Sequence, residues 1–439
     1  MLKNKHFIFG HLFILVICIF GEFIMMTTNQ VKSEIRNIKL VKSSIFMVIL
    51  LLSCAHFSIE AKDNLSKKIQ ASIDVNAVEL LTDPKINSVS IGVFSDGKKY
   101  ISHFGELDKG KGNTPTNNTI YEIASVSKTL TGVLVANAVL EGKLNLDDDI
   151  RIYLDQKFDS FEYNNKPVQI KHLLTHTSGL PKFLPESIPP LFSDFNESLP
   201  FKVHAIQVAY NKDDFFSDLK RIKLSSEPGT EYSYSNVDTE LMAQILENVY
   251  HKPFDVLLQN YFRSIANMQN TFVKIPSNLQ SELANGYGIT GKKVPHEVVL
   301  YGADGGVKTT MTDLVNYLEL QLSKENIVIE ESHRNLSDVN SKKIAYYMPI
   351  KVSEEYGLYY SMHGGGFGTQ NWFFIIPKYN LGISIITNQS DLETADKLLK
   401  TLRSIVESVI FNKYPKKESS HTTFKGSNLG GFYHKGQTQ

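Results

Sequence analysis

Residues 371–388, NWFFIIPKYNLGISIITN, decide the fold of this chain. Two runs rich in β-branched and aromatic residues flank a turn at Pro377 to Asn380, a pattern that predicts a β-hairpin. Apolar residues then recur at helical spacing, which predicts a final helix that covers the sheet. These residues are Leu398, Leu399, Leu402, Ile405, Val406 and Val409.

A second hairpin is predicted near the other end, over residues 86–107. Its two apolar strands, INSVSIGVFS and KKYISHFGEL, are joined by Asp96-Gly97, a strong short-range hairpin signal. We expect both hairpins to share one antiparallel sheet, because strands at the two ends need a common partner surface.

The segment between the hairpins is mostly helical in pattern. One helix is predicted to stop before Pro253, and Thr310 with Asp313 indicates a capping box that opens another. The first of these has apolar residues at Leu241, Met242, Ile245, Leu246 and Val249. The predicted fold is therefore α/β: an antiparallel sheet built from both ends and flanked by helices, with an inserted, mainly helical lobe. A functional site is expected in the cleft between the two parts.

Composition narrows the class of protein. The 439 residues are 42% hydrophobic and 21% charged, which is typical of a folded protein. Forty-six basic residues balance 46 acidic ones, so the electrostatic footprint of a nucleic-acid-binding protein is missing. We divide the chain into an N-terminal signal or anchor region (1–61), one main domain (62–414) and a polar tail (415–439).

The N-terminal region contains two apolar runs, residues 7–26 and 45–53, separated by a basic stretch. A basic leader followed by the short second run favours a secretory signal and export to the periplasm. The alternative is a membrane anchor formed by the first run. Met25 and Met26, just before the basic stretch, offer an alternative start.

Both cysteines, Cys18 and Cys54, lie in this region. The rest of the chain therefore cannot hold a disulfide, a thiolate metal site or a cysteine nucleophile. The stretch LLSCA around Cys54 also looks like a bacterial lipoprotein signal, with a cysteine buried in a signal core as the equal alternative.

The stretch YEIASVSKTL, residues 121–130, carries the first candidate site residues. Ser125 and Lys128 are three apart in an apolar helical pattern that ends at Gly142, so their side chains should share a face in the first turn. Burial disfavours the lysine cation, and a neutral amine beside a hydroxyl is a base beside a nucleophile. Two other Ser-x-x-Lys pairs, Ser95/Lys98 at the hairpin turn and Ser217/Lys220 in a charged stretch, are interpreted as accidental.

His172 and His176 are four apart, a spacing that some zinc sites use. Leu173 follows His172 where a zinc peptidase needs glutamate, so we predict a structural role in holding the helical lobe, and no metal or cofactor.

Three further stretches complete a pattern: IKHLLTHTSGLP (170–181), PGTEYSYSN (228–236) and MHGGGFG (362–368). With YEIASVSKTL, and in this order, they resemble the serine hydrolases that include class C β-lactamases, penicillin-binding DD-peptidases and related esterases. The resemblance covers roughly residues 80–410 and implies a β-lactamase/transpeptidase-like fold.

The resemblance implies roles for the motif residues. Ser125 would be the acylated nucleophile and Lys128 its base, while Tyr234 would share the proton transfers and Asn236 would hold the substrate amide.

The third motif would begin at His363 and line the cleft, with Gly364 and Gly365 letting the substrate approach closely. Backbone N–H groups of Ser125 and Gly366 would form the oxyanion hole.

The third motif departs from the β-lactamases, which usually have lysine, threonine and glycine there. A histidine weakens the case for lactam hydrolysis and favours a D-alanyl-D-alanine carboxypeptidase-like or esterase activity on a small-molecule or peptide substrate. The alternatives are a β-lactamase, a non-catalytic penicillin-binding-like module and a membrane-tethered structural protein. Residues 183–223 carry no motif that identifies the substrate.

Overall fold

The computed structural model describes residues 64–414. The predicted signal or anchor, Cys54 and the tail lie outside the described residues, so those assignments stay predictions. Within residues 64–414, no helix is both long enough and apolar enough to span a bilayer.

A seven-stranded antiparallel sheet lies within residues 88–387, in the order β2-β1-β13-β12-β11-β10-β9. The first strand pairs with the last along Ser90–Ser95 and Leu381–Ile386, which confirms that the two ends of the domain share one sheet. The strands are β1 (Ser88–Ser95), β2 (Lys98–Gly105), β9 (Lys343–Ile344), β10 (Pro349–Ser353), β11 (Gly357–Gly365), β12 (Gln370–Ile376) and β13 (Leu381–Thr387).

Both predicted hairpins are confirmed, and their turns have the expected chemistry. Asp96 and Gly97 both adopt positive φ, +50° and +78°, as the two-residue turn between right-twisted strands requires. The C-terminal hairpin turns through Pro377–Tyr379, followed by Asn380 at φ +45°.

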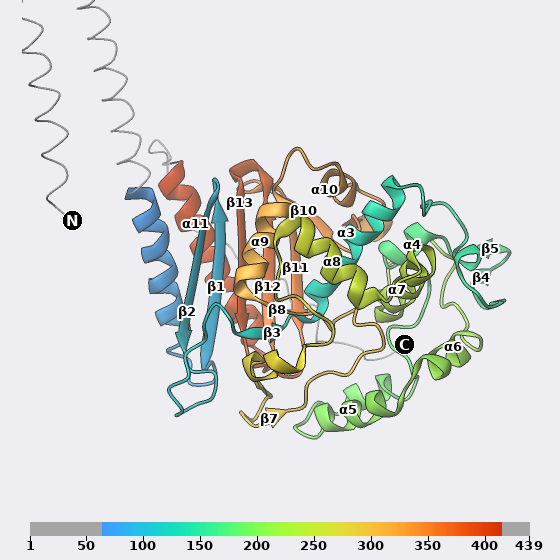
Figure 1. The fold of residues 1–439 in the computed structure, drawn as a ribbon, viewed down its shortest axis with the longest axis horizontal. Helices are drawn as coiled ribbons and strands as arrows, with labels where there is room; N and C mark the ends of the chain where they lie inside the picture. The colour runs from blue at the N-terminus through green and yellow to red at the C-terminus, as the bar shows by residue number, and fades with distance from the viewer. Residues whose placement is uncertain (1–63, 415–439) are drawn as a thin grey trace, which may run out of the picture. The chain divides into compact units, whose positions relative to one another are not determined.

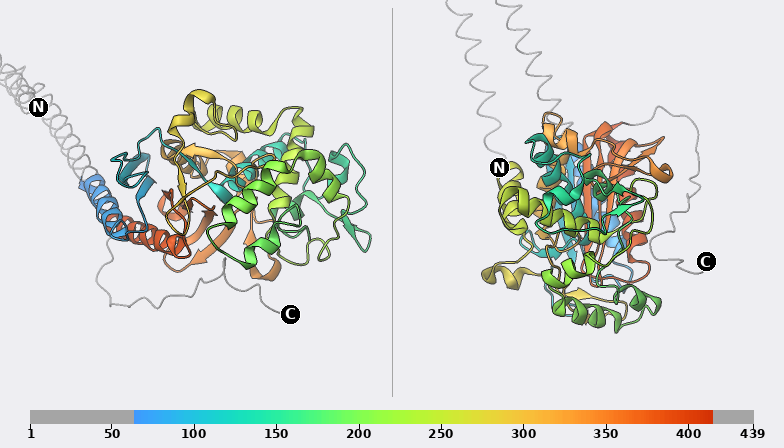
Figure 2. Two further views of the ribbon diagram at one scale, coloured as in Figure 1. Left: turned by 90° about the horizontal axis from the view of Figure 1, so that it is seen from below. Right: turned by 90° about the vertical axis from the view of Figure 1, so that its right-hand side faces the viewer.

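Helices cover both faces of the sheet, α9 (Met311–Gln321) on one and α11 (Thr394–Lys413) on the other (Figures 1 and 2). The six apolar positions predicted for the final helix are all buried in α11. Two glycines let α9 lie close: a methyl group on Gly92 would overlap Val315, and one on Gly382 would lie 2.9 Å from Leu318.

The chain between β2 and β9 forms the helical lobe and three two-stranded pairs (Figure 1). Besides α9, the α-helices between β2 and β9 are α3 (Ser127–Leu140), α4 (Ile170–Leu174), α5 (Leu199–Ala209), α6 (Lys212–Leu219), α7 (Asn236–Tyr250), α8 (Phe254–Ala266) and α10 (Ile327–Ser332). One more helix, residues 64–80, precedes β1. The pairs are β3 (Ile120–Glu122) with β8 (Lys308–Thr310), β4 (Glu162–Tyr163) with β5 (Lys166–Pro167), and β6 (Gly286–Tyr287) with β7 (Lys293–Val294).

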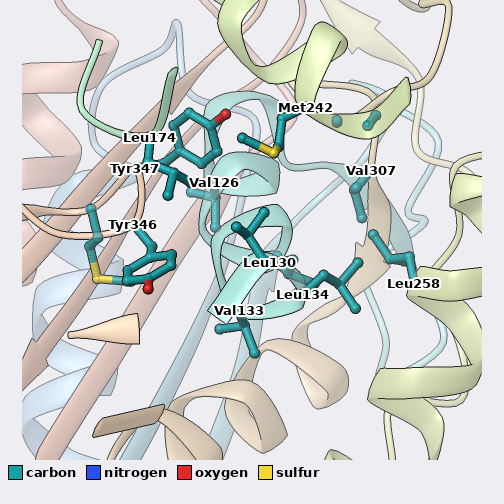
Figure 3. Close-up of a cluster of buried hydrophobic side chains, with 14 of the residues drawn as sticks. Val126, Leu130, Val133, Leu134, Leu174, Met242, Leu258, Val307, Tyr346 and Tyr347 are labelled. Carbon is teal, nitrogen blue, oxygen red and sulfur yellow. The ribbon is translucent and has the colours of Figure 1, made fainter. Parts of the chain in front are cut away.

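Helix α3 runs through the core, as its nearly all-round burial shows. Figure 3 shows Leu130, Val133 and Leu134 on α3 surrounded by side chains from the lobe and from the segment before β10. Each such buried side chain stabilises the fold by roughly 1.5–3 kcal/mol. The start of α3 is therefore a rigid support for a functional group.

One predicted capping box is only half formed. The Thr310 hydroxyl accepts the backbone N–H of Asp313, so α9 begins where predicted. The Asp313 carboxylate does not return to Thr310; it accepts the N–H of Asn270 and the hydroxyl of Thr271 instead. The predicted bond from the Asp313 side chain back to Thr310 is therefore wrong, because the loop at Asn270 and Thr271 binds the carboxylate instead.

Candidate active site

Ser125 stands on a sharp turn directly before α3. It is the middle residue of a 3₁₀ turn, η1 (Ala124–Val126), rather than part of the first α-helical turn as predicted. Ala124 has φ +44°, a backbone conformation that is costly outside glycine and concentrates at functional sites. The turn presents the Ser125 hydroxyl to a cavity of about 1030 Å³.

Lys128 lies below Ser125, and its side chain is 0% exposed. Its Nζ lies 3.3 Å from Ser125 Oγ and 2.8 Å from Asn236 Oδ1, and it also contacts the carbonyl oxygen of Asp304. The amine therefore has three oxygen neighbours, and the predicted apposition of Ser125 and Lys128 is present in the structure.

Tyr234 also contacts the Ser125 hydroxyl. Its hydroxyl lies 2.7 Å from Ser125 Oγ, and its ring centroid lies 4.9 Å from Lys128 Nζ. Ser235 fixes this position as the N-cap of α7: its Oγ accepts the N–H of Asp238 and donates to the carbonyl of Pro181. The first two motifs are therefore brought together around one hydroxyl group.

The THTSG stretch supports Tyr234 from below. The ring of His176 lies 4.5 Å from that of Tyr234, and its Nδ1 lies 2.9 Å from Asp238, which also accepts the Ser178 hydroxyl. Burial lowers the pKa of His176 and raises that of Asp238, so both neutral forms are favoured.

The two histidines do not share a helix, because α4 ends at Leu174 and His176 follows at φ +55°. His172 instead accepts the N–H of Gln169 at the start of α4. The separate partners agree with a structural role for both rings.

The third motif lies on an open sheet edge. Strand β10 pairs with β11 only as far as Tyr360, so residues 361–365 have a strand on one side only, β12. On the open side, Ser361, Met362, His363 and Gly365 line the cavity. The N–H of Gly366 donates to the carbonyl of Thr369 across the hairpin, 2.9 Å away. Because inward and outward N–H groups alternate along an antiparallel strand, the N–H of Gly365 faces the open edge. The prediction that Gly366 supplies the oxyanion-hole N–H is therefore wrong in this structure.

His363 borders the same cavity but makes its hydrogen bond elsewhere. Its Nε2 lies 2.7 Å from Gln370 Oε1, and its ring lies 4.7 Å from that of Trp372. Burial lowers its pKa, so the neutral ring is the dominant form near neutral pH. The structure gathers Ser125, Lys128, Tyr234 and Asn236 tightly, and it places His363 farther along the edge.

Gly364 is packed against the turn that carries the nucleophile. A methyl group there would overlap the carbonyl oxygen of Ile123 and lie 2.5 Å from Asn371 Nδ2. Gly364→Ala is expected to lower the free energy of unfolding by about 1–3 kcal/mol. It should also lower any turnover at Ser125 by on the order of 100-fold, because the turn must move. Chemical denaturation and initial rates check both effects.

Gly365→Ala is the matched control for stability. Its methyl group would lie 3.0 Å from atoms of Gln370 and His363, whose side chains can shift. Equal losses of stability in the two variants would contradict the close packing inferred for Gly364.

A family model described as Beta-lactamase matches residues 73–407, most of the chain, including every motif above. The chain belongs to the beta-lactamase family. The predicted family resemblance is thereby confirmed, and so is the fold of beta-lactamase-family serine hydrolases.

Relatives and solved structures agree with this membership. Protein flp of Staphylococcus aureus (strain N315) is 27% identical over 355 residues, covering 77% of this chain and 67% of that protein. The crystal structure of a beta-lactamase/D-alanine carboxypeptidase from Pseudomonas syringae has a TM-score of 0.66 at 19% identity, over 77% of this chain and 98% of that one. A class C beta-lactamase crystal structure reaches 0.65 at 21% identity, over 78% and 98%. The last two show the shared fold.

This member of the beta-lactamase family also has cavity residues that no sequence motif indicated. Glu240 accepts the N–H groups of Tyr301 and Asp304, and so positions the carbonyl that holds Lys128. Burial, followed by the charge of Asp304, raises the pKa of Glu240. Glu297 lies in the same cavity.

Proposed function

We propose that the protein is a serine hydrolase that forms an acyl-enzyme on Ser125, with carboxypeptidase-like or esterase activity. One observation supports this most: two proton-carrying groups, the Tyr234 hydroxyl at 2.7 Å and the Lys128 amine at 3.3 Å, contact the same Ser125 oxygen. Nucleophile and base within hydrogen-bond reach are the signature of covalent acyl transfer.

In the first step, Ser125 Oγ attacks the substrate carbonyl carbon and its proton passes to Lys128 or Tyr234. The carbonyl oxygen becomes an oxyanion, which backbone N–H groups of Ser125 and Gly365 would stabilise. The carbon–leaving-group bond then breaks, and the leaving group takes up the proton that Ser125 lost, delivered through Tyr234. Water attacks the resulting ester and gives a proton to Lys128 or Tyr234, which returns it to Ser125 Oγ as the acid is released.

The third motif favours this activity over lactam hydrolysis. Where the β-lactamases have a lysine, His363 is held neutral by burial and bonded to Gln370, so no full positive charge stands there to bind a lactam carboxylate. An open strand edge suits an extended peptide, which can add main-chain hydrogen bonds to residues 361–365.

A specific feature of the cavity favours esters with apolar acyl groups. Three phenylalanines stack along its wall: Phe183 on Phe192 at 5.5 Å, and Phe192 on Phe367 at 6.2 Å. Binding is stabilised when an apolar acyl group buries its surface against these aromatic rings. A charged peptide does not gain the same stabilisation, because it has less apolar surface to bury there.

Phe192→Ala is expected to reduce kcat/KM for p-nitrophenyl octanoate by about tenfold and for p-nitrophenyl acetate by much less. The longer chain loses apolar contacts that the acetyl group never made. Initial rates with both esters give the ratio. The control is Phe201→Ala, since Phe201 is 52% exposed on α5. An unchanged octanoate-to-acetate ratio in Phe192→Ala would remove the argument for apolar acyl groups.

Intact-mass spectrometry tests the proposed function as a whole. The chain is incubated with a penicillin, a D-Ala-D-Ala peptide and a p-nitrophenyl ester, with Ser125→Ala alongside. We expect a mass gain that maps to Ser125, and turnover with the peptide or ester. Rapid turnover of the penicillin would instead favour a β-lactamase. No adduct and no turnover would favour a non-catalytic penicillin-binding-like module.

We propose export, with the protein in the periplasm or attached to a membrane, from the N-terminal pattern alone. Cell fractionation, with palmitate labelling of wild type and Cys54→Ser, separates a cleaved signal from an anchor and from a lipoprotein.

A further inference from the structure

Glu297 occupies the gap between the nucleophile turn and the end of β11. Its Oε1 would lie 3.3 Å from a methyl group placed on Gly366, and its Oε2 would lie 3.8 Å from one placed on Gly305. That second methyl group would in turn lie 3.7 Å from the carbonyl carbon of Ala124, the residue before Ser125. The carboxyl group therefore lies between the nucleophile turn and Gly366, in the cavity that Ser125 also lines.

The backbone of Glu297 is fixed by β3, since its N–H donates to Glu122 at 3.2 Å. Burial raises the pKa of the Glu297 carboxyl to about 8, and the negative charges of Glu122 and Asp304 add to this effect. Two nearby lysines, Lys308 and Lys128, oppose it. The charged and titratable groups that face this corner are Glu122, His296, Asp304, Lys308 and Lys128.

A neutral carboxyl group differs chemically from a carboxylate at this position. It carries one O–H donor, whereas a carboxylate only accepts hydrogen bonds and would repel a developing oxyanion. The donor matters here because the N–H of Gly366 is bonded to Thr369, so of these two glycines only Gly365 has a backbone donor left for the hole.

We propose that Glu297 is a further catalytic residue, whose neutral carboxyl group donates a hydrogen bond to the substrate carbonyl oxygen as that oxygen becomes negative. The inference rests on the proposed acyl-enzyme function at Ser125. Glu297 neither gains nor loses its proton in the step; the proton of Ser125 still passes to Lys128 or Tyr234.

The proposal predicts in which direction the Ser125-dependent rate changes with pH. Below about pH 8 the carboxyl group is neutral and donates; above it the group is ionised and opposes the oxyanion. For an uncharged ester, the Ser125-dependent rate should therefore fall by roughly tenfold between pH 7 and pH 9.

The test uses the full chain, p-nitrophenyl acetate and pH values from 6 to 10, with the Ser125→Ala rate subtracted as background. Glu297→Gln keeps an N–H donor that does not titrate, so it should retain the rate at pH 7 within about threefold and lose the fall above pH 8. Glu297→Ala should lose on the order of 100-fold at pH 7. Glu325→Gln, an exposed glutamate, is the matched control and should follow wild type.

Two outcomes would overturn this inference alone: Glu297→Gln keeps the wild-type fall above pH 8, or folded Glu297→Ala keeps the wild-type rate at pH 7. If Glu297→Ala does not fold, the pH profile of the isosteric Glu297→Gln decides. Absence of Ser125-dependent turnover at every pH would instead overturn the proposed function, and this inference with it.

Discussion

Ser125→Ala is expected to lower kcat for ester hydrolysis by on the order of 10⁴-fold or more, because it removes the hydroxyl group on which we propose that the covalent intermediate forms. Stability should hardly change, since the Ser125 hydroxyl faces the cavity and its loss leaves no backbone group unpaired. Initial rates, intact mass and thermal denaturation of the two proteins check these expectations.

Other serines serve as controls. Ser217 repeats the Ser-x-x-Lys pattern on the exposed face of α6, so Ser217→Ala should keep full activity. Ser127, two residues after Ser125, is buried and accepts the N–H of Val307 at 3.1 Å, so it cannot reach a substrate. More than a tenth of wild-type activity in Ser125→Ala would rule out Ser125 as the nucleophile.

Much of the fold followed from turn chemistry and periodicity. Asp96-Gly97 and Pro377 to Asn380 each predicted a hairpin, and the pairing of β1 with β13 joined them as expected. The short strands β9 and β10, at one end of the sheet, were not predicted, because two to five residues are too few for a period to emerge.

The part of the candidate site that consists of side chains at fixed sequence spacing could be predicted from the sequence. Ser125, Lys128, Tyr234 and Asn236 meet as their motifs implied, although their catalytic roles stay predictions. The structure adds Asp304, which contributes a backbone carbonyl that any residue could supply. It also shows which glycine N–H faces the cavity, since hairpin register and not composition decides that.

Glu297 was missed for a different reason. Its chemistry depends on burial and on the neighbouring charges of Glu122 and Asp304, from three separate parts of the chain. No local pattern in HEVVL, residues 296–300, distinguishes it from an exposed glutamate. Environment-dependent pKa values require the folded arrangement.

Lys128→Ala is expected to lower kcat nearly as much as Ser125→Ala, on the order of 10⁴-fold, because Ser125 without its partner keeps its proton. The double variant Ser125→Ala/Lys128→Ala should then be no slower than Ser125→Ala alone, since the two residues act on one step as a unit. Initial rates of the three proteins, read as a double-mutant cycle, measure this.

Lys128 also has a structural role, and experiments must separate this role from its role in proton transfer. Removing its amine leaves the Asn236 amide oxygen and the Asp304 carbonyl without a donor, at about 1–3 kcal/mol each. Lys128→Met keeps the volume and loses the same bonds, so it should be destabilised to a similar degree. Lys182→Met is the control. Lys182 also lines the cavity, but within the described residues its side chain makes no hydrogen bond to Ser125 or Lys128, so this variant should keep most activity.

Added alkylamines can separate the two parts. If they restore turnover to folded Lys128→Ala but not to Lys128→Met, whose side chain fills the space, then the missing function is the amine and not the fold. Near-normal turnover in stable Lys128→Ala would leave Tyr234 as the base that takes the proton of Ser125.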